Sequence, residues 1–190
     1  MFDKLILIAS ILLLFVIALI PHLSTTTKMG FRPPAVPLLV YDPYLSIWSN
    51  GTYLANQSTR AWRGKIANLT SLIKIDGRTY RLMGKQPNNL STLEQKSLTV
   101  FPLRSVYVFE GHGISVTMTF FAPRVPSNLK IFSWPITYIV WNIYSTDDHI
   151  HRVKIYYSTS SQLAVNTFDE KVDWERKIDG SVLDLKIGTV

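Results

Sequence analysis

Apolar and polar residues alternate over most of the chain that follows its first two dozen residues. In Ile114–Phe120, apolar residues occupy every second position, and Ser or Thr occupies the positions between them. This period of two is typical of a strand with one buried face and one solvated face. The segments Ser71–Ile75 and Arg78–Met83 flank the dipeptide Asp76-Gly77, which favours a tight hairpin because both turn positions adopt positive φ. The pattern therefore predicts antiparallel strands joined by short turns.

The same period predicts strands in the second half of the chain. The predicted segments are a strand region Leu98–Phe109 turned back at Glu110–Gly113, a strand candidate Ile131–Tyr144 interrupted by Pro135, the alternating stretch Val153–Tyr157, and a last hairpin at Asp179-Gly180. In this last hairpin, we expect Leu183, Leu185 and Ile187 to point inward and the charged residues between them to point outward. Without a helical period beyond the N-terminal segment, the predicted fold is mainly β. We expect an antiparallel β-sandwich preceded by an N-terminal hydrophobic signal or anchor helix.

The N-terminal segment Met1–Leu23 is predicted to direct the chain to a membrane. Its stretch Leu5–Ile20 carries no charge and would measure about 24 Å as a helix, against a hydrocarbon core of about 30 Å. That length fits a cleaved secretory signal peptide, but a poor small-x-small pattern around Ala18–Ser24 leaves an uncleaved signal anchor as the alternative. Residues 24–31 are interpreted as a linker. We expect a secreted protein or one on the extracellular face of a membrane, with membrane contact only through residues 1–23 if they are retained.

Composition narrows the choice of function. The 190 residues include no cysteine, which excludes a disulfide framework and a thiol nucleophile. The net charge of +7 is spread singly along the chain, and no Gly-rich phosphate loop is present. A scattered positive excess is typical of a solvated surface, so we expect no nucleic-acid partner and no bound cofactor. A chain of this length buries about 70% of its unfolded surface, which is enough for a core without disulfides.

Four Asn-x-Ser/Thr triplets lie within forty residues of one another, and none has proline at its middle position. They begin at Asn50, Asn56, Asn68 and Asn89. Each is chemically competent to accept an N-linked glycan. Behind a signal-like segment, these triplets predict a glycoprotein of the secretory pathway.

Aromatic residues gather around an acid in the stretch Pro33–Ser49. Asp42 precedes Pro43 and is a turn-forming residue by type, although the aromatics beside it also make it a candidate for ligand contact. Tyr44 and Trp48 lie in the same stretch, and Trp62 follows a polar loop. Aromatic side chains of this kind either stack on a sugar ring or fill a core. We therefore name Asp42, Tyr44, Trp48 and Trp62 as a possible ligand or domain interface.

No catalytic group can be selected from spacing alone. His149 and His151 lie two residues apart beside two aspartates, which on a strand would put both imidazoles on one face, as a metal pair requires. The ordinary interpretation is a polar turn entering a strand, and no third ligand can be identified, so no metal site is predicted. The chain lacks a G-x-S-x-G motif, and nothing in the spacing of its acids selects a catalytic pair. The catalytic residues are therefore unknown.

Several separated phrases carry a resemblance to a known family. They are RPPAVPLLVYDPYLSIWS (Arg32–Ser49), Trp62 with Gly64, SLIKIDGRTYRLMG (Ser71–Gly84), SWPITYIVWNIYSTDDHIHRVKIYY (Ser133–Tyr157) and KVDWER (Lys171–Arg176). Together and in this order, they resemble the beginning of the glutaminase A family. By this resemblance, residues 32–84 form the arm, loop and hairpin of the family's opening segment. Residues 85–190 then form a β-sandwich domain that is truncated at its C-terminus.

The resemblance implies a secreted or surface hydrolase associated with release of ammonia from glutamine. Family members are longer, with a β-sandwich followed by a helical toroid whose cleft holds the catalytic groups, so no catalytic residue transfers to this sequence. The first hypothesis is an N-terminal sandwich that supports a downstream helical domain of the same protein. The alternative is a non-catalytic carbohydrate-binding module. The expected ligand is accordingly a small amide or a carbohydrate.

Overall fold

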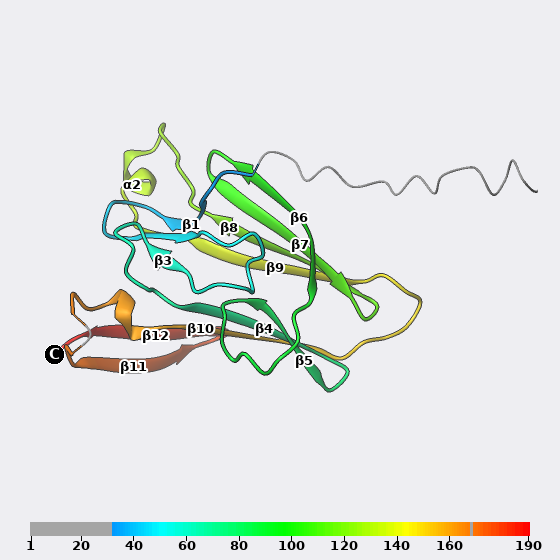
Figure 1. Ribbon diagram of the computed structural model, residues 1–190. Helices are drawn as coiled ribbons and strands as arrows, with labels where there is room; N and C mark the ends of the chain where they lie inside the picture. The colour runs from blue at the N-terminus through cyan, green and yellow to red at the C-terminus, as the bar shows by residue number, and fades with distance from the viewer. Residues whose placement is uncertain (1–31, 168) are drawn as a thin grey trace, which may run out of the picture.

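The computed structural model describes residues 32–167 and 169–190, so the predicted leader 1–23 and linker 24–31 lie outside the described residues. Over the described ranges the chain is almost entirely strand (Figure 1). The helical parts there are one turn of α-helix, α2 (Leu129–Phe132), and one 3₁₀ turn, η1 (Ser161–Leu163). No helix in this part of the chain is long and apolar enough to cross a membrane. The predicted mainly β class is confirmed.

In residues 32–167 and 169–190, twelve strands form four antiparallel sheets. The first has the order β1-β2-β3, made of β1 (Val36–Val40), β2 (Ser46–Ser49) and β3 (Arg60–Ala61). The second has the order β10-β4-β5, made of β10 (Val153–Thr159), β4 (Leu69–Ile75) and β5 (Arg78–Met83). The third runs β6-β7-β8-β9, with β6 (Glu94–Phe101), β7 (Arg104–Gly111), β8 (Ile114–Phe121) and β9 (Tyr138–Ser145). The fourth is the hairpin of β11 (Val172–Asp179) and β12 (Val182–Thr189).

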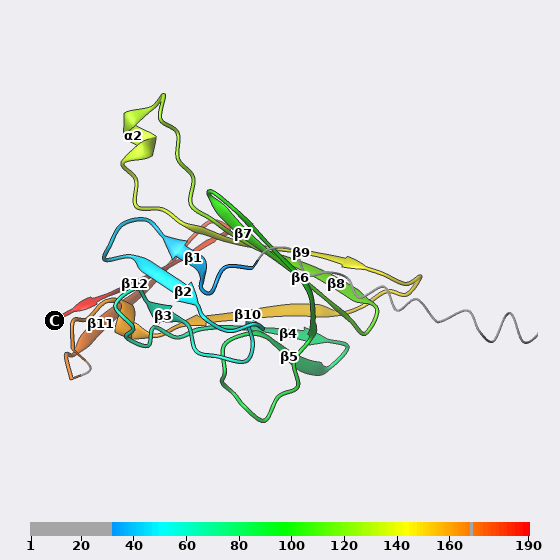
Figure 2. The same cartoon turned by 45° about the horizontal axis from the view of Figure 1, so that its top comes forward.

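The four-stranded sheet lies over the sheet β10-β4-β5, and β1 packs against β7 and β8 (Figure 2). The side chains that point between these layers form one hydrophobic core. Its largest fully buried members include Tyr107, Phe109, Phe120, Ile47, Ile73 and Leu82. Polar bonds also join the layers: the indole Nε1 of Trp141 in β9 donates to Ser71 Oγ in β4 at 3.1 Å. The described residues 32–163 therefore form a sandwich built from strands that are distant in sequence.

Two of the hairpin turns follow directly from their residues. Asp76 and Gly77 have φ of 47° and 90°, and His112 and Gly113 have φ of 54° and 72°. Two consecutive positive φ angles are what a type I′ turn requires, and Asx-Gly and similar pairs adopt them readily. The predicted hairpin at Asp76-Gly77 is confirmed, as is the turn at Glu110–Gly113.

Two predicted strand segments are wrong in their extent. Leu98–Phe109 is not one strand region, because β6 and β7 pair across a tight turn at Pro102–Leu103. Ile131–Tyr144 is not continuous either, because α2 covers its beginning and β9 starts only at Tyr138. Asn128 caps α2 by accepting a hydrogen bond from a backbone N–H of the helix, and such a cap competes with extended structure. Period-two patterning alone carries no signal for either interruption.

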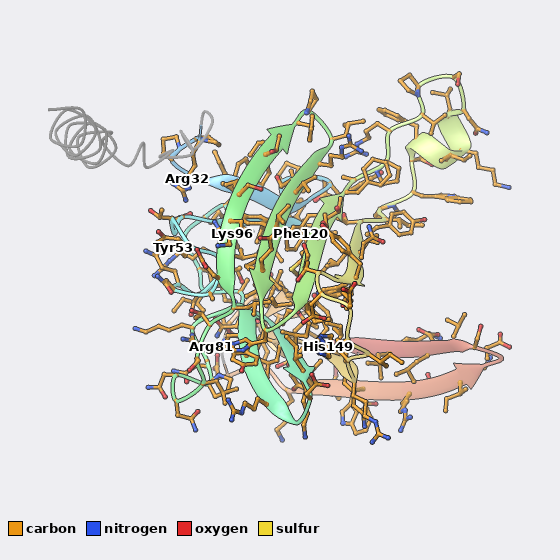
Figure 3. The ribbon with its side chains drawn as sticks, turned by 90° about the vertical axis from the view of Figure 1, so that its right-hand side faces the viewer. Arg32, Tyr53, Arg81, Lys96, Phe120 and His149 are labelled. Atoms are coloured by element: carbon orange, nitrogen blue, oxygen red, sulfur yellow. The ribbon has the colours of Figure 1, made fainter. Side chains whose placement is uncertain are left out.

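The hairpin β11-β12 extends away from the sandwich (Figure 3). Its alternation is as predicted, but Leu183, Leu185 and Ile187 are 51%, 59% and 39% exposed. The expectation that they point inward is therefore wrong for the described part of the chain. Alternation fixes which side chains share a face, whereas burial requires a second surface against that face.

Candidate functional site

A hollow of about 390 Å³ lies beside β2 and β3 and contains two of the sequence-predicted aromatics. Tyr44 and Trp62 line it, together with the segment Gln162–Asn166 from the other end of the chain. Buried Ile47 and Ala67 also line it. The hollow thus has an aromatic rim and a mixed polar and apolar lining, because Arg63 and Lys65 line it beside Ile47 and Ala67. Its volume is within the range of small-molecule sites.

The rim aromatics are exposed and close to a cation. Tyr44 is 87% exposed and Trp62 is 67% exposed. Trp62 contacts Trp48 with ring centroids 5.1 Å apart and an angle of 48° between the ring planes. The Arg63 guanidinium lies 6.0 Å from the Tyr44 ring centroid. Trp48 itself lines a separate, neighbouring hollow of about 290 Å³. The structure therefore places Tyr44 and Trp62 on one hollow, and Trp48 contacts Trp62 from the neighbouring hollow.

Asp42 serves its turn rather than the hollow. Its Oδ1 accepts hydrogen bonds from the backbone N–H groups of Tyr44 at 2.7 Å and Leu45 at 2.9 Å. This arrangement is an Asx turn, which fixes the bend before β2. Asp42 does not line the hollow, so the carboxylate positions Tyr44 through the backbone.

Lys65 links the two walls of the hollow beside β2 and β3. Lys65 Nζ donates to the backbone carbonyls of Val165 at 3.2 Å and Asn166 at 2.9 Å. These bonds join residues about a hundred positions apart and hold the segment Gln162–Asn166 against β3. The spatial pairing of Trp62 with that segment has no signature in the sequence, because it depends on how β10 returns beside β4.

All four asparagines of the Asn-x-Ser/Thr triplets are exposed. Asn50 directly follows β2, Asn56 lies in the loop before β3, Asn68 precedes β4, and Asn89 lies in the loop between β5 and β6. Asn56 also lines a hollow of about 330 Å³ together with Tyr53 and Gln95. Surface exposure is the requirement that a folded domain imposes on a glycan acceptor.

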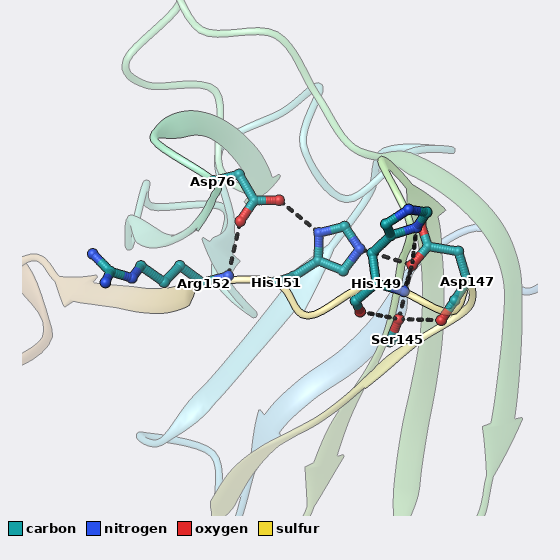
Figure 4. A network of polar contacts seen from close by, with 6 residues as sticks. All are labelled: Asp76, Ser145, Asp147, His149, His151 and Arg152. Atoms are coloured by element: carbon teal, nitrogen blue, oxygen red, sulfur yellow. Dashed lines mark hydrogen bonds and ion pairs between the residues drawn. The ribbon is translucent and has the colours of Figure 1, made fainter.

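A histidine in the loop between β9 and β10 is held by two carboxylates (Figure 4). His151 Nδ1 is 2.6 Å from Asp76 Oδ2, and its Nε2 is 2.9 Å from Asp147 Oδ1. Asp76 Oδ1 also accepts from the backbone N–H of Arg152 at 2.8 Å. Asp147 Oδ1 accepts from the His149 backbone N–H at 3.0 Å. The His151 side chain is only 12% exposed.

This geometry sets the protonation of the cluster. An ionised carboxylate only accepts hydrogen bonds, so His151 must carry protons on both ring nitrogens to bond both partners. The hydrogen bond to Asp76 is the largest cause that raises the pKa of His151, and the hydrogen bond to Asp147 is the second largest. The same bonds lower the pKa of Asp76 and bring the pKa of Asp147 down to about 2. The two carboxylates thus favour the charged form of the imidazole between them.

A glycine makes room for this cluster and joins it to a third turn. A Cβ on Gly113 would overlap Asp147 Oδ2 and the imidazole of His151, and its φ of 72° also favours glycine. The Gly113 carbonyl accepts from the Thr146 backbone N–H at 2.8 Å. His112 stacks on Tyr80 with centroids 4.4 Å apart. The β4-β5 turn, the β7-β8 turn and the β9-β10 loop are thereby tied together.

The contacts of the cluster are those of a structural clamp between three turns. Both ring nitrogens of His151 are occupied, while His149 has a side chain that is 81% exposed. Among residues 32–167 and 169–190, no three His, Cys, Asp or Glu residues are grouped so that they could hold a metal ion. The nearby Ser145 hydroxyl donates to Asp147 Oδ1 at 3.1 Å, and no bond joins it to the imidazole. The sequence singled out His151 but could not show its partner Asp76, which lies 75 residues earlier.

The chain is similar to two protein families and to an individual protein. Two family models match the chain, one described as a domain of unknown function (DUF4964) over residues 12–95 and one as a domain of unknown function (DUF5127) over residues 103–190. The chain is thus a β-rich protein to which these two family models match one after the other.

One protein similar to this chain is glutaminase A of Aspergillus oryzae (strain ATCC 42149 / RIB 40). It is 31% identical to this chain over 160 residues, which cover 80% of the chain and 23% of the relative. The resemblance to the glutaminase A family drawn from the sequence phrases is confirmed. The chain spans under a quarter of the length of this curated relative. No solved structure matches it.

Proposed function

We propose that this chain is the amino-terminal β-sandwich part of a secreted or membrane-anchored hydrolase similar to glutaminase A. In this proposal the sandwich is a scaffold for a helical catalytic region located elsewhere in a longer protein. The observation that carries the proposal is the match to glutaminase A, which extends along 80% of this chain but only 23% of the relative. A protein of the relative's length has room for a separate catalytic region.

The polar chemistry of the described residues supports a scaffold role. Releasing ammonia from an amide requires an activated nucleophile and a proton donor for the leaving group. In the cluster around His151, the imidazole is saturated by two carboxylates, and the Ser145 hydroxyl donates to Asp147. Neither group is poised to attack a substrate.

Ammonia release from glutamine tests this proposal. The 190-residue chain is expected to release no ammonia above the uncatalysed rate, whereas a protein that continues through the following reading frame is expected to be active. Turnover by the 190-residue chain alone would contradict the scaffold role. A longer protein that circular dichroism shows to be folded but that releases no ammonia would contradict the glutaminase-like activity.

The aromatic hollow favours a second candidate function, binding of a carbohydrate. Exposed Tyr44 and Trp62 rim a hollow of mixed polar and apolar lining that includes Arg63, and stacking of sugar rings uses exposed aromatic faces. Trp62→Ala is expected to abolish binding to an oligosaccharide array if this function holds. The matched control is Trp174→Ala, because Trp174 is 68% exposed and Trp62 67%. Equal loss in both variants, or no signal from the unmodified chain, would remove this candidate.

Passage through the secretory pathway is part of the proposal. The exposure of Asn50, Asn56, Asn68 and Asn89 supports it, because each is accessible to a glycan. Expression in a eukaryotic host is expected to give a mass that falls on treatment with an N-glycosidase. Resistance of the membrane fraction to alkaline extraction would indicate a retained anchor, and release would indicate a cleaved leader. A protein without glycan in the cytosolic fraction would contradict the localisation.

A further inference from the structure

The hairpin β11-β12 has two faces of opposite character. Residues directly opposite each other in its register share a face, and the pairs include Trp174 with Ile187, Arg176 with Leu185 and Ile178 with Leu183. One face therefore carries Val172, Trp174, Ile178, Leu183, Leu185 and Ile187, with Arg176 among them. The other carries Asp173, Glu175, Lys177, Asp179, Val182, Asp184 and Lys186. The hairpin is an amphipathic ribbon with one apolar side.

The apolar side is open in the described part of the chain. Trp174 is 68% exposed, Ile178 65% and Leu185 59%, and Figure 3 shows the hairpin extending away from the sheets. A two-stranded hairpin by itself is marginally stable in water and needs a packed face. A contiguous exposed apolar surface with a charged opposite side is typical of a docking surface.

The size of the apolar face of the hairpin bears on which kind of partner can cover it. Two strands of eight residues are about 27 Å long and about 10 Å wide, which gives a footprint of roughly 270 Å². A stable interface between separate proteins buries about 800 Å² on each partner. A second copy of this chain is the competing partner, and the dimerisation outcome of the test below distinguishes it. A partner in the same polypeptide needs far less area, because its effective concentration is high.

We propose that the apolar face of β11-β12 is the docking surface for the polypeptide that follows residue 190 in the full-length protein. This inference rests on the proposed function, because a protein of the relative's length supplies that polypeptide. The covering surface is apolar and carries a carboxylate opposite Arg176, which makes no ion pair with any described residue. The charged face of the hairpin stays in water.

Hydrogen exchange of residues 172–189 tests the proposal, comparing the 190-residue chain with the full-length protein. In the full-length protein, the hairpin amides are expected to exchange at least about tenfold more slowly than in the 190-residue chain. Leu185→Asp in the full-length protein is expected to remove this protection. Val182→Asp is the matched control, because Val182 is 61% exposed and lies on the charged face. It is expected to leave the protection intact.

Equal exchange of the hairpin in both lengths would overturn the proposal. Equal effects of Leu185→Asp and Val182→Asp would also overturn it, as would concentration-dependent dimerisation of the 190-residue chain that Leu185→Asp abolishes. Ammonia release by the same full-length preparations keeps the two proposals apart. An active protein with an unprotected hairpin refutes this inference alone, and a protected hairpin in a protein inactive on glutamine refutes the proposed activity alone.

Discussion

Trp141 and Ser71 join the two layers of the sandwich, and replacing them singly and together measures that link. The Trp141 indole lies between the layers, donates to Ser71 Oγ at 3.1 Å, and meets the Tyr157 ring edge-on at 5.7 Å. Ser71 is fully buried at 0% exposure. If β9 and β4 face each other as described, the variants Trp141→Phe and Ser71→Ala affect one shared interaction.

The expected size of the coupling follows from this geometry. A neutral hydrogen bond contributes about 0.5–1.5 kcal/mol net to the free energy of unfolding. Either single change leaves a polar group without its partner in a largely buried place, at a cost of about 1–3 kcal/mol. The double variant removes both groups, so its destabilisation should fall short of the sum of the two singles by about 0.5–1.5 kcal/mol.

Urea unfolding followed by far-ultraviolet circular dichroism measures the four free energies without depending on tryptophan fluorescence. The control cycle pairs Ser71→Ala with Trp174→Phe, which lies on the projecting hairpin, and this cycle is expected to be additive within about 0.3–0.5 kcal/mol. Additivity of Trp141→Phe with Ser71→Ala would refute the contact between β9 and β4. The sandwich arrangement at that place would then be wrong.

The remaining predictions concern the clamp. The raised pKa of His151 contributes stability that is complete below its ordinary value of 6.5 and is lost as pH rises through the raised value. The urea midpoint should therefore fall as pH rises above 6.5. His151→Gln should flatten this decline, whereas His149→Gln should keep it. An unchanged profile in His151→Gln would contradict the clamp. The lowered pKa of Asp147, about 2, contributes stability present above pH 4 and lost as pH falls towards 2, which the acid limb of the same titration measures. Gly64→Ala, at a φ of 85° with open space around it, should cost about 1–2 kcal/mol for backbone conformation alone. Gly113→Ala should cost more and also flatten the pH profile, because its Cβ overlaps the clamp; equal costs would show that the clamp yields freely.

Local patterning was informative where a strand or turn depends on near neighbours. Alternation in Ile114–Phe120 indicated β8, and Asp76-Gly77 indicated the β4-β5 turn, because side-chain direction and turn φ are decided within a few residues. The same reasoning missed the turn at Pro102–Leu103 and the helix α2, because the period-two pattern carries no signal for either of them. The Asx turn at Asp42 was the interpretation suggested by its residue type, and the structure bears it out.

The sequence by itself determined the β class, the alternating faces and the resemblance to glutaminase A, since each is written in residue order. Tertiary structure alone decided which groups meet. His151 finds Asp76 because β10 returns beside β4, and Trp62 shares a hollow with Gln162–Asn166 for the same reason. It also decided that the apolar residues of β12 lie exposed, because burial depends on whether another surface arrives and not on the pattern that prepares for it.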